Sequence, residues 1–150
     1  MSQAADREHL LAEEERPWTE LHRLVDSHSQ DRVDEPGYFQ EGWSAKDLVA
    51  HIGSWLAEAG VVLERIRSGT YRPDEIDVDA MNAVFRENTR DVPFHDVRAQ
   101  AFTARERMVR AWRSLREVSP EADRWIAKAG PEHYAEHLPR LQEWVEENTG

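Results

Sequence analysis

Apolar residues recur every three or four positions along most of this chain, which is the spacing of one face of an α-helix. In residues 44–68 six of them form a single stripe: Leu48, Ile52, Trp55, Ala59, Val62 and Ile66. Ser44 is placed to cap the first turn, and Asp47 suits the third position of a capping box. The pattern predicts a helix that begins at Ser44 and ends at Ser68 and Gly69.

Three other stretches carry the same periodicity: residues 5–27, residues 93 to about 119, and the segment from Trp125 to Val145. Pro17 lies inside the first stretch, so that helix is either kinked there or preceded by a short turn. In the last stretch, Gly130 and Pro131 mark a point of interruption. Residues 29–42 contain Asp34, Pro36 and Gly37 and are typical of a loop.

Residues 70–92 are too many for a tight turn. Four apolar residues indicate a short helix inside this connection: Val78, Met81, Val84 and Phe85. We expect the connection to cross from one end of a helical bundle to the other and to bury apolar side chains. Because no stretch alternates β-branched and polar residues, the chain is predicted to be one all-α domain over residues 1–150.

The composition limits the partners of this domain. Hydrophobic residues make up 39%, enough for a core, while 30 Asp and Glu against 19 Lys and Arg give a net charge of −11. Such a surface repels phosphate backbones and anionic membranes, so we expect no nucleic-acid partner and no membrane partner. Without a membrane span or the features of a signal peptide, the expected location is the cytoplasm. The absence of cysteine excludes disulfides, thiolate metal ligands and a cysteine nucleophile.

Three histidines are placed to share a metal ion. His133 and His137 are four residues apart, one helical turn, with His137 beside the apolar face and His133 at its edge. His51 lies at the edge of the stripe of residues 44–68, at a seam between helices. Three neutral imidazoles favour Zn, Ni, Co or Fe(II) over Mg or Ca and leave a position for water or substrate. On spacing alone, the alternative is three histidines that serve only as surface or core-edge residues.

Two stretches resemble helices of the DinB-like superfamily of bacterial four-helix bundles, which includes the mycothiol-dependent maleylpyruvate isomerases. GWSAKDLVAHI is similar to the start of the second helix of these proteins, through Trp43, Ser44, Asp47 and His51. EHYAEHLPRLQEWV, residues 132–145, resembles their fourth helix, where a His-x3-His or Glu-x3-His pair completes a metal site. Its His-Tyr-x-x-His run most resembles the branch of small colibactin-resistance proteins.

The resemblance implies a four-helix bundle with a long connection between helices 2 and 3, and frequent homodimers. It also implies a divalent-metal site, with Zn or Ni as the first candidates, whose ligands are His51, His133 and His137. The implied activity is that of a thiol-dependent transferase or isomerase, or of a hydrolase, on a small-molecule substrate. A low-molecular-weight thiol would then enter as cosubstrate, because the chain has no cysteine of its own.

The residues that would carry the chemistry beside the ligands are not identified by the sequence. Glu58, Glu132 or Glu136 could orient an imidazole or move a proton, and Arg140 could pair with an anionic substrate. Each of the four is more typical of a solvated surface. A second class of function is a binding or resistance protein that sequesters a toxic compound without turnover, and a third is a bundle with a vestigial site.

Overall fold

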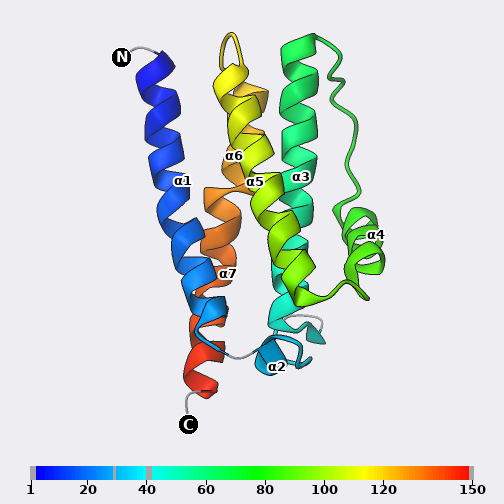
Figure 1. Ribbon diagram of the computed structural model, residues 1–150. Helices are drawn as coiled ribbons and strands as arrows, with labels where there is room; N and C mark the ends of the chain where they lie inside the picture. The colour runs from blue at the N-terminus through cyan, green and yellow to red at the C-terminus, as the bar shows by residue number, and fades with distance from the viewer. Residues whose placement is uncertain (1–2, 29, 40–41, 149–150) are drawn as a thin grey trace.

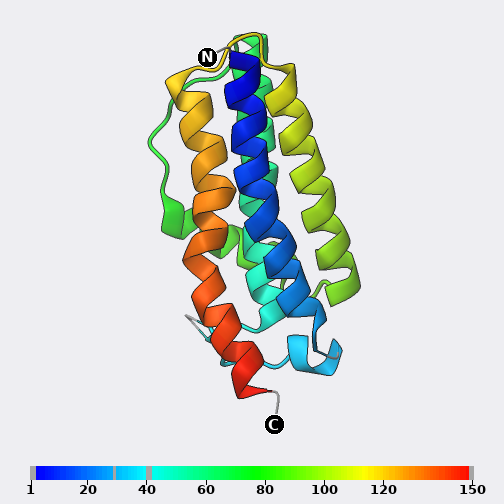
Figure 2. The ribbon, with the colours of Figure 1, turned by 90° about the vertical axis from the view of Figure 1, so that its left-hand side faces the viewer.

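The computed structural model describes residues 3–28, 30–39 and 42–148, and within these ranges the protein is all-α, as predicted. The helices are α1 (Gln3–Asp26), α2 (Gln30–Val33), α3 (Ala45–Ser68), α4 (Val78–Thr89), α5 (Phe94–Ser114), α6 (Pro120–Ala129) and α7 (Pro131–Glu147). α1, α3 and α5 lie side by side with a rod in which α7 follows α6 end to end (Figures 1 and 2). No helix in the described ranges is long and apolar enough to cross a membrane.

The two predicted ends of α3 are confirmed. The Ser44 hydroxyl accepts a hydrogen bond from the Asp47 amide at 3.1 Å, and the Asp47 carboxylate accepts one from the Ser44 amide at 3.1 Å. This reciprocal capping box satisfies two amides that the helix itself leaves without partners. Gly69 ends the helix with φ 77°, a left-handed conformation that a residue with a Cβ adopts only with strain.

The buried face of α3 differs from the predicted stripe at Trp55 and Ile66. Leu48, Ile52, Ala59 and Val62 are buried as expected, but Trp55 and Ile66 are only half-buried. Leu56, adjacent to Trp55, is fully buried. The reason is that α3 packs most extensively against α5, and closely enough that a Cβ on Gly53 would lie 3.0 Å from that of Ala101. Trp55 therefore lies beside this contact and faces α4.

α1 runs without interruption through Pro17, so a short turn before that residue is excluded. The predicted loop of residues 29–42 contains the short α2, and residues 29, 40 and 41 lie outside the described ranges. α5 carries its predicted apolar stripe but ends at Ser114, earlier than expected. The next helix starts at Pro120, because the Ser119 hydroxyl accepts a hydrogen bond from the Ala122 amide. The interruption at Gly130 is confirmed, between α6 and α7.

The connection between α3 and α5 contains the predicted short helix, α4, capped by the carboxylate of Asp77. Contrary to expectation, α4 buries none of its residues, and Val78 and Val84 remain 51% and 57% exposed. Beside the packing of Phe85 on the Trp55 ring, polar contacts attach it to α3. Lys46 Nζ donates to the carbonyls of Arg90 and Val92, Arg86 pairs with Asp47 at 3.4 Å, and the Trp55 indole donates to Asn82. α4 lies on the outside of α3 (Figure 1).

A buried ion pair joins α1, α5 and α7. Glu14 has no exposed surface, and its carboxylate accepts two hydrogen bonds from Arg105 at 2.6 and 3.0 Å. It also accepts one from the Tyr134 hydroxyl at 2.9 Å. Burial, with the Glu14 charge adding to it, raises the pKa of Tyr134 well above its ordinary value, so the phenol keeps the proton that it donates. This network lies at the α6–α7 junction, where a Cβ on Gly130 would contact Glu14.

Candidate metal centre

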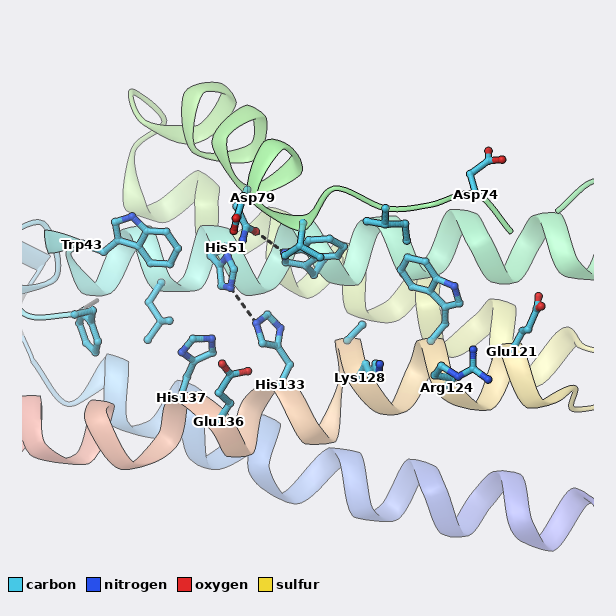
Figure 3. A pocket seen from close by; sticks show the side chains of 18 of the residues that line it. Trp43, His51, Asp74, Asp79, Glu121, Arg124, Lys128, His133, Glu136 and His137 are labelled. Carbon is cyan, nitrogen blue, oxygen red and sulfur yellow. Dashed lines mark hydrogen bonds between the residues drawn. The ribbon is translucent and has the colours of Figure 1, made fainter. Parts of the chain in front are cut away.

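The structure brings the three predicted histidines together. His51 comes from α3, and His133 and His137 come from successive turns of α7, all pointing into the same space (Figure 3). One ligand atom from each lies within 4.8 Å of the other two. The Nε2 atoms of His51 and His133 are 3.0 Å apart. This cluster is the only group of three potential ligands of this kind among the described residues.

The degree of burial within the cluster is the reverse of what the sequence suggested. His133, expected at the edge of the apolar face, is 9% exposed, while His137 is only half-buried. His133 precedes Tyr134, which is fully buried against Glu14 and so turns this part of α7 toward the interior. The two ligands therefore lie at different depths, with His133 nearer the core.

All three imidazoles are neutral at pH 7. Burial lowers the pKa of His51 to about 4, and the neighbouring His137 contributes in the same direction. Burial also lowers the pKa of His133 to about 3, assisted by His51 and His137 and opposed by the backbone of Ala129. For His137 burial lowers the pKa, and Glu136 opposes the effect. A neutral imidazole has a free lone pair, which is the form that binds a metal ion.

The donor set fits a divalent transition-metal ion. Two imidazole nitrogens bound tetrahedrally at the usual Zn–N length are about 3.3 Å apart, close to the 3.0 Å between the His51 and His133 Nε2 atoms. His137 Nε2 is buried and has no hydrogen-bond partner within the described part of the chain, so it is available as a third ligand. Three imidazoles leave at least one coordination position open, which is characteristic of catalytic rather than structural sites.

The histidines line one end of a cavity of about 930 Å³ between α3, α6, α7 and the segment that leads into α4. Five aromatic residues contribute to its walls: Phe39, Trp43, Trp55, Tyr71 and Trp125. The ring centroid of Trp43 lies 4.9 Å from that of His51. At the other end are the charged side chains of Asp74, Glu121 and Arg124 (Figure 3). A cavity of this size holds a drug-sized molecule.

The candidate accessory residues are only partly at the site. Glu136 lines the cavity beside His137, whereas Glu58 and Glu132 are not among the lining residues. Asp79 and Asn82 of α4 also line it, as do Arg124 and Lys128 of α6. Sequence reasoning missed these four because no local pattern indicates which face of a surface helix will border a cavity. The Asp77 cap and the Ser119 cap, which position α4 and α6, were the available signals.

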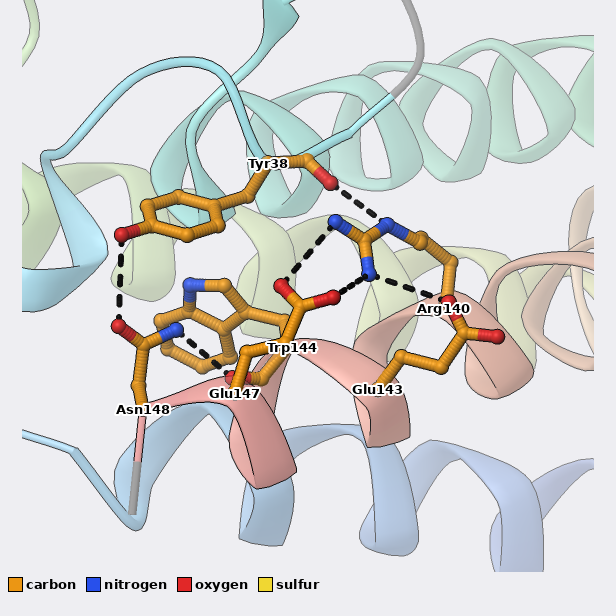
Figure 4. A network of polar contacts seen from close by, with 6 residues as sticks. All are labelled: Tyr38, Arg140, Glu143, Trp144, Glu147 and Asn148. Atoms are coloured by element: carbon orange, nitrogen blue, oxygen red, sulfur yellow. Dashed lines mark hydrogen bonds and ion pairs between the residues drawn. The ribbon is translucent and has the colours of Figure 1, made fainter. Parts of the chain in front are cut away.

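Arg140 lines the cavity too, but its guanidinium has other partners (Figure 4). Its Nε donates to the Tyr38 carbonyl at 2.7 Å, and its terminal nitrogens donate to Glu143 and Glu147 at 2.8 to 3.3 Å. The bond to Tyr38 attaches α7 to the segment that precedes Trp43, while the bonds to Glu143 and Glu147 stay within α7. Arg140 therefore holds one wall of the cavity in place, with its guanidinium already paired to two carboxylates.

Comparisons of the chain with protein-family models, with curated proteins and with solved structures found no match. The resemblance to the DinB-like superfamily thus stays an inference from the two motifs that carry it. The function has to be argued from the chemistry of the three histidines and from the cavity that they line.

Proposed function

We propose that this protein is a divalent-metal-dependent enzyme acting on a small molecule, with His51, His133 and His137 as the ligands. The observation that carries the proposal is the convergence of three neutral imidazoles at one end of a large cavity. Buried polar groups normally have hydrogen-bond partners. Here two imidazoles face only each other through Nε2, and the third leaves Nε2 without a partner in the described ranges. One shared cation would be coordinated by all three nitrogens.

The proposal includes membership of the DinB-like superfamily as a four-helix bundle. Its four helices would be α1, α3, α5 and the α6–α7 rod, with α4 inside the long connection between the second and third. The side-by-side arrangement of these elements supports this (Figures 1 and 2). Homodimers are frequent in that superfamily, so we propose one here, to be tested by light scattering of the purified protein.

His51, His133 and His137 would hold a zinc or nickel ion, which would supply Lewis acidity to a water or thiol in the cavity. The protein's own residues hold and orient the site. Trp43 packs against the ring of His51 and limits its rotation. Glu136, whose charge opposes the lowering of the His137 pKa, would accept a proton from a molecule bound in the cavity. A thiol, where the reaction needs one, enters as cosubstrate, because the chain has no cysteine.

Metal analysis of protein purified without a histidine tag tests the proposal. We expect about one Zn or Ni per chain, as in mononuclear three-histidine sites. The His51→Ala variant should lose this metal, while His95→Ala should keep it, since His95 is an exposed histidine that does not line the cavity. Cobalt loading should give the intense visible bands of a tetrahedral site in the wild type and in His95→Ala only. Equal metal content in both variants would refute the assignment.

A sequestering or resistance protein of the same fold is the second candidate, favoured by the size and aromatic walls of the cavity. Such a protein binds its ligand equally well before and after chelation, and the ligand is recovered unchanged. An enzyme converts the ligand, and the conversion stops when the metal is removed. Incubation of the ligand with stoichiometric protein, followed by mass spectrometry, separates the two.

A further inference from the structure

The six tryptophans of the chain fall into two groups. Trp18, Trp112 and Trp144 belong to the core, and none is more than 4% exposed. Trp43, Trp55 and Trp125 are half-buried, and all three line the cavity that ends at the histidines. Because the rings of these three tryptophans are not fully buried, they stabilise the fold less than core tryptophans do. Their concentration around one cavity is characteristic of a ligand-binding surface.

Two of the three cavity tryptophans are held in position by their polar edges. The Trp55 indole nitrogen donates to Asn82 Oδ1 at 2.7 Å, and the ring packs against Phe85 with centroids 5.3 Å apart. The Trp125 indole nitrogen donates to the Tyr71 hydroxyl at 3.3 Å. Both acceptors belong to the connection between α3 and α5. Because the N–H groups are already bonded, what these rings offer to the cavity is apolar aromatic surface.

The part of the cavity that Trp55 and Trp125 line begins close to the histidines. Trp55 follows His51 by one turn of α3, a rise of about 6 Å, and Trp125 precedes His133 by eight residues along the α6–α7 rod, about 12 Å. Trp55 therefore lines the part of the cavity next to the cluster, and Trp125 lines a part farther from it. Beyond Trp125, the cavity is lined by two carboxylates and one guanidinium, those of Asp74, Glu121 and Arg124, whereas Lys128 lies between Trp125 and His133 along the rod (Figure 3). This outer end carries both signs of charge, so it does not require a charged ligand.

We propose that the cavity binds a small molecule with a planar aromatic ring system, packed against Trp55 and Trp125 with its reactive group toward the three histidines. The orientation of the reactive group rests on the proposed function, and the aromatic ring system adds the class of substrate. Aromatic rings gain contact energy with one another beyond the area that they bury. A saturated ring system of similar size would fill the same space without this gain.

Titration of metal-free protein with the neutral fluorescent probe N-phenyl-1-naphthylamine tests the site. Trp55→Leu and Trp125→Leu should each weaken binding about fivefold or more. Trp55→Phe, which keeps a ring, should retain most of the affinity. Phe102→Leu is the matched control, since Phe102 is a half-buried aromatic residue of α5 that does not line the cavity. Urea unfolding of every variant establishes that it is folded before the titrations are compared.

Displacement of the probe distinguishes an aromatic site from a merely apolar one. 2-Naphthol should displace it at about fivefold lower concentration than decahydro-2-naphthol, its saturated analogue. Equal displacement by the two alcohols, or unchanged probe affinity in Trp125→Leu, would overturn the proposal. The titrations use metal-free protein, so their outcome does not depend on whether the three histidines bind a metal ion. Failure of the metal assignment is therefore visible separately from failure of the aromatic site.

Discussion

The Glu14 network offers the sharpest test of how the fold holds α7, and with it two of the three histidines. Replacing Glu14 by glutamine keeps the size of the side chain but removes its charge. The new amide group would point N–H donors at the N–H donors of Arg105, and only its oxygen could still accept a bond. Arg105 would then keep a positive charge without its partner, since Glu14 is the only carboxylate that pairs with it in the described ranges.

Removing one partner of a buried ion pair typically costs about 3–5 kcal/mol, because the other charge is left uncompensated. Arg105 retains 22% exposure of its side chain, so water partly solvates it and we expect the lower end, about 3 kcal/mol. For a domain of this length that loss lowers Tm by about 6–12 °C. Glu8→Gln is the matched control, because the Glu8–Arg113 pair has 62% and 58% exposed side chains. Its loss should be below about 1 kcal/mol.

Urea unfolding of chelator-treated protein at pH 7, followed by circular dichroism, measures both losses with the metal removed from the comparison. The double variant Glu14→Met, Arg105→Met should regain part of the stability, since it leaves no buried charge. If Glu14→Gln unfolds at the same urea concentration as Glu8→Gln, the buried pair does not stabilise the helix packing as argued.

Replacement of two glycines of α3 by alanine should change the stability in opposite directions. Gly53→Ala should lower the free energy of unfolding by about 1–3 kcal/mol through overpacking against Ala101. Gly60→Ala, whose new Cβ has no neighbour nearer than 3.5 Å, should raise it by up to about 1 kcal/mol. Effects of one sign in urea unfolding would contradict the described packing. Burial and the nearby Arg98 lower the pKa of His22 to about 4. As the pH falls, this imidazole is therefore protonated in the unfolded chain before it is protonated in the folded protein. The free energy of unfolding should fall by up to about 3 kcal/mol as the pH drops from 6.5 toward 4. His22→Phe should lack this share of the decline, and an unchanged pH profile would refute it. Zinc added to stripped protein should raise Tm in the wild type but not in His51→Ala; a rise in both would place the ion elsewhere.

Several features could be predicted because they depend on residues close together in the chain. The capping box of Ser44 and Asp47 forms within one helical turn, and Gly69 ends the same helix through its own backbone conformation. The break at Gly130 and the one-turn spacing of His133 and His137 are equally local. The predicted helices follow from such signals, as does the pairing of two histidines on one face.

Other features could not be predicted because they depend on which helices pack together. Glu14 stands in a run of three glutamates, and only the positions of Arg105 and Tyr134 decide that it is buried. Trp55 fits the apolar stripe of its helix, yet contact with α4 places it at the cavity. The same holds for Arg140, whose partners include the backbone of Tyr38, far away in the chain.

The amino-acid order alone thus accounts for the helices, their caps and two histidines on one face of α7, since backbone hydrogen bonds and helical periodicity act over three or four residues. The third histidine is 82 positions from His133, and no local rule sets the rotation at which α3 meets α7. That rotation follows from side-chain packing throughout the core, including the close approach of Gly53 to α5 and the Glu14 network behind His133. Tertiary packing therefore decided that three imidazoles converge and that an aromatic cavity opens beside them.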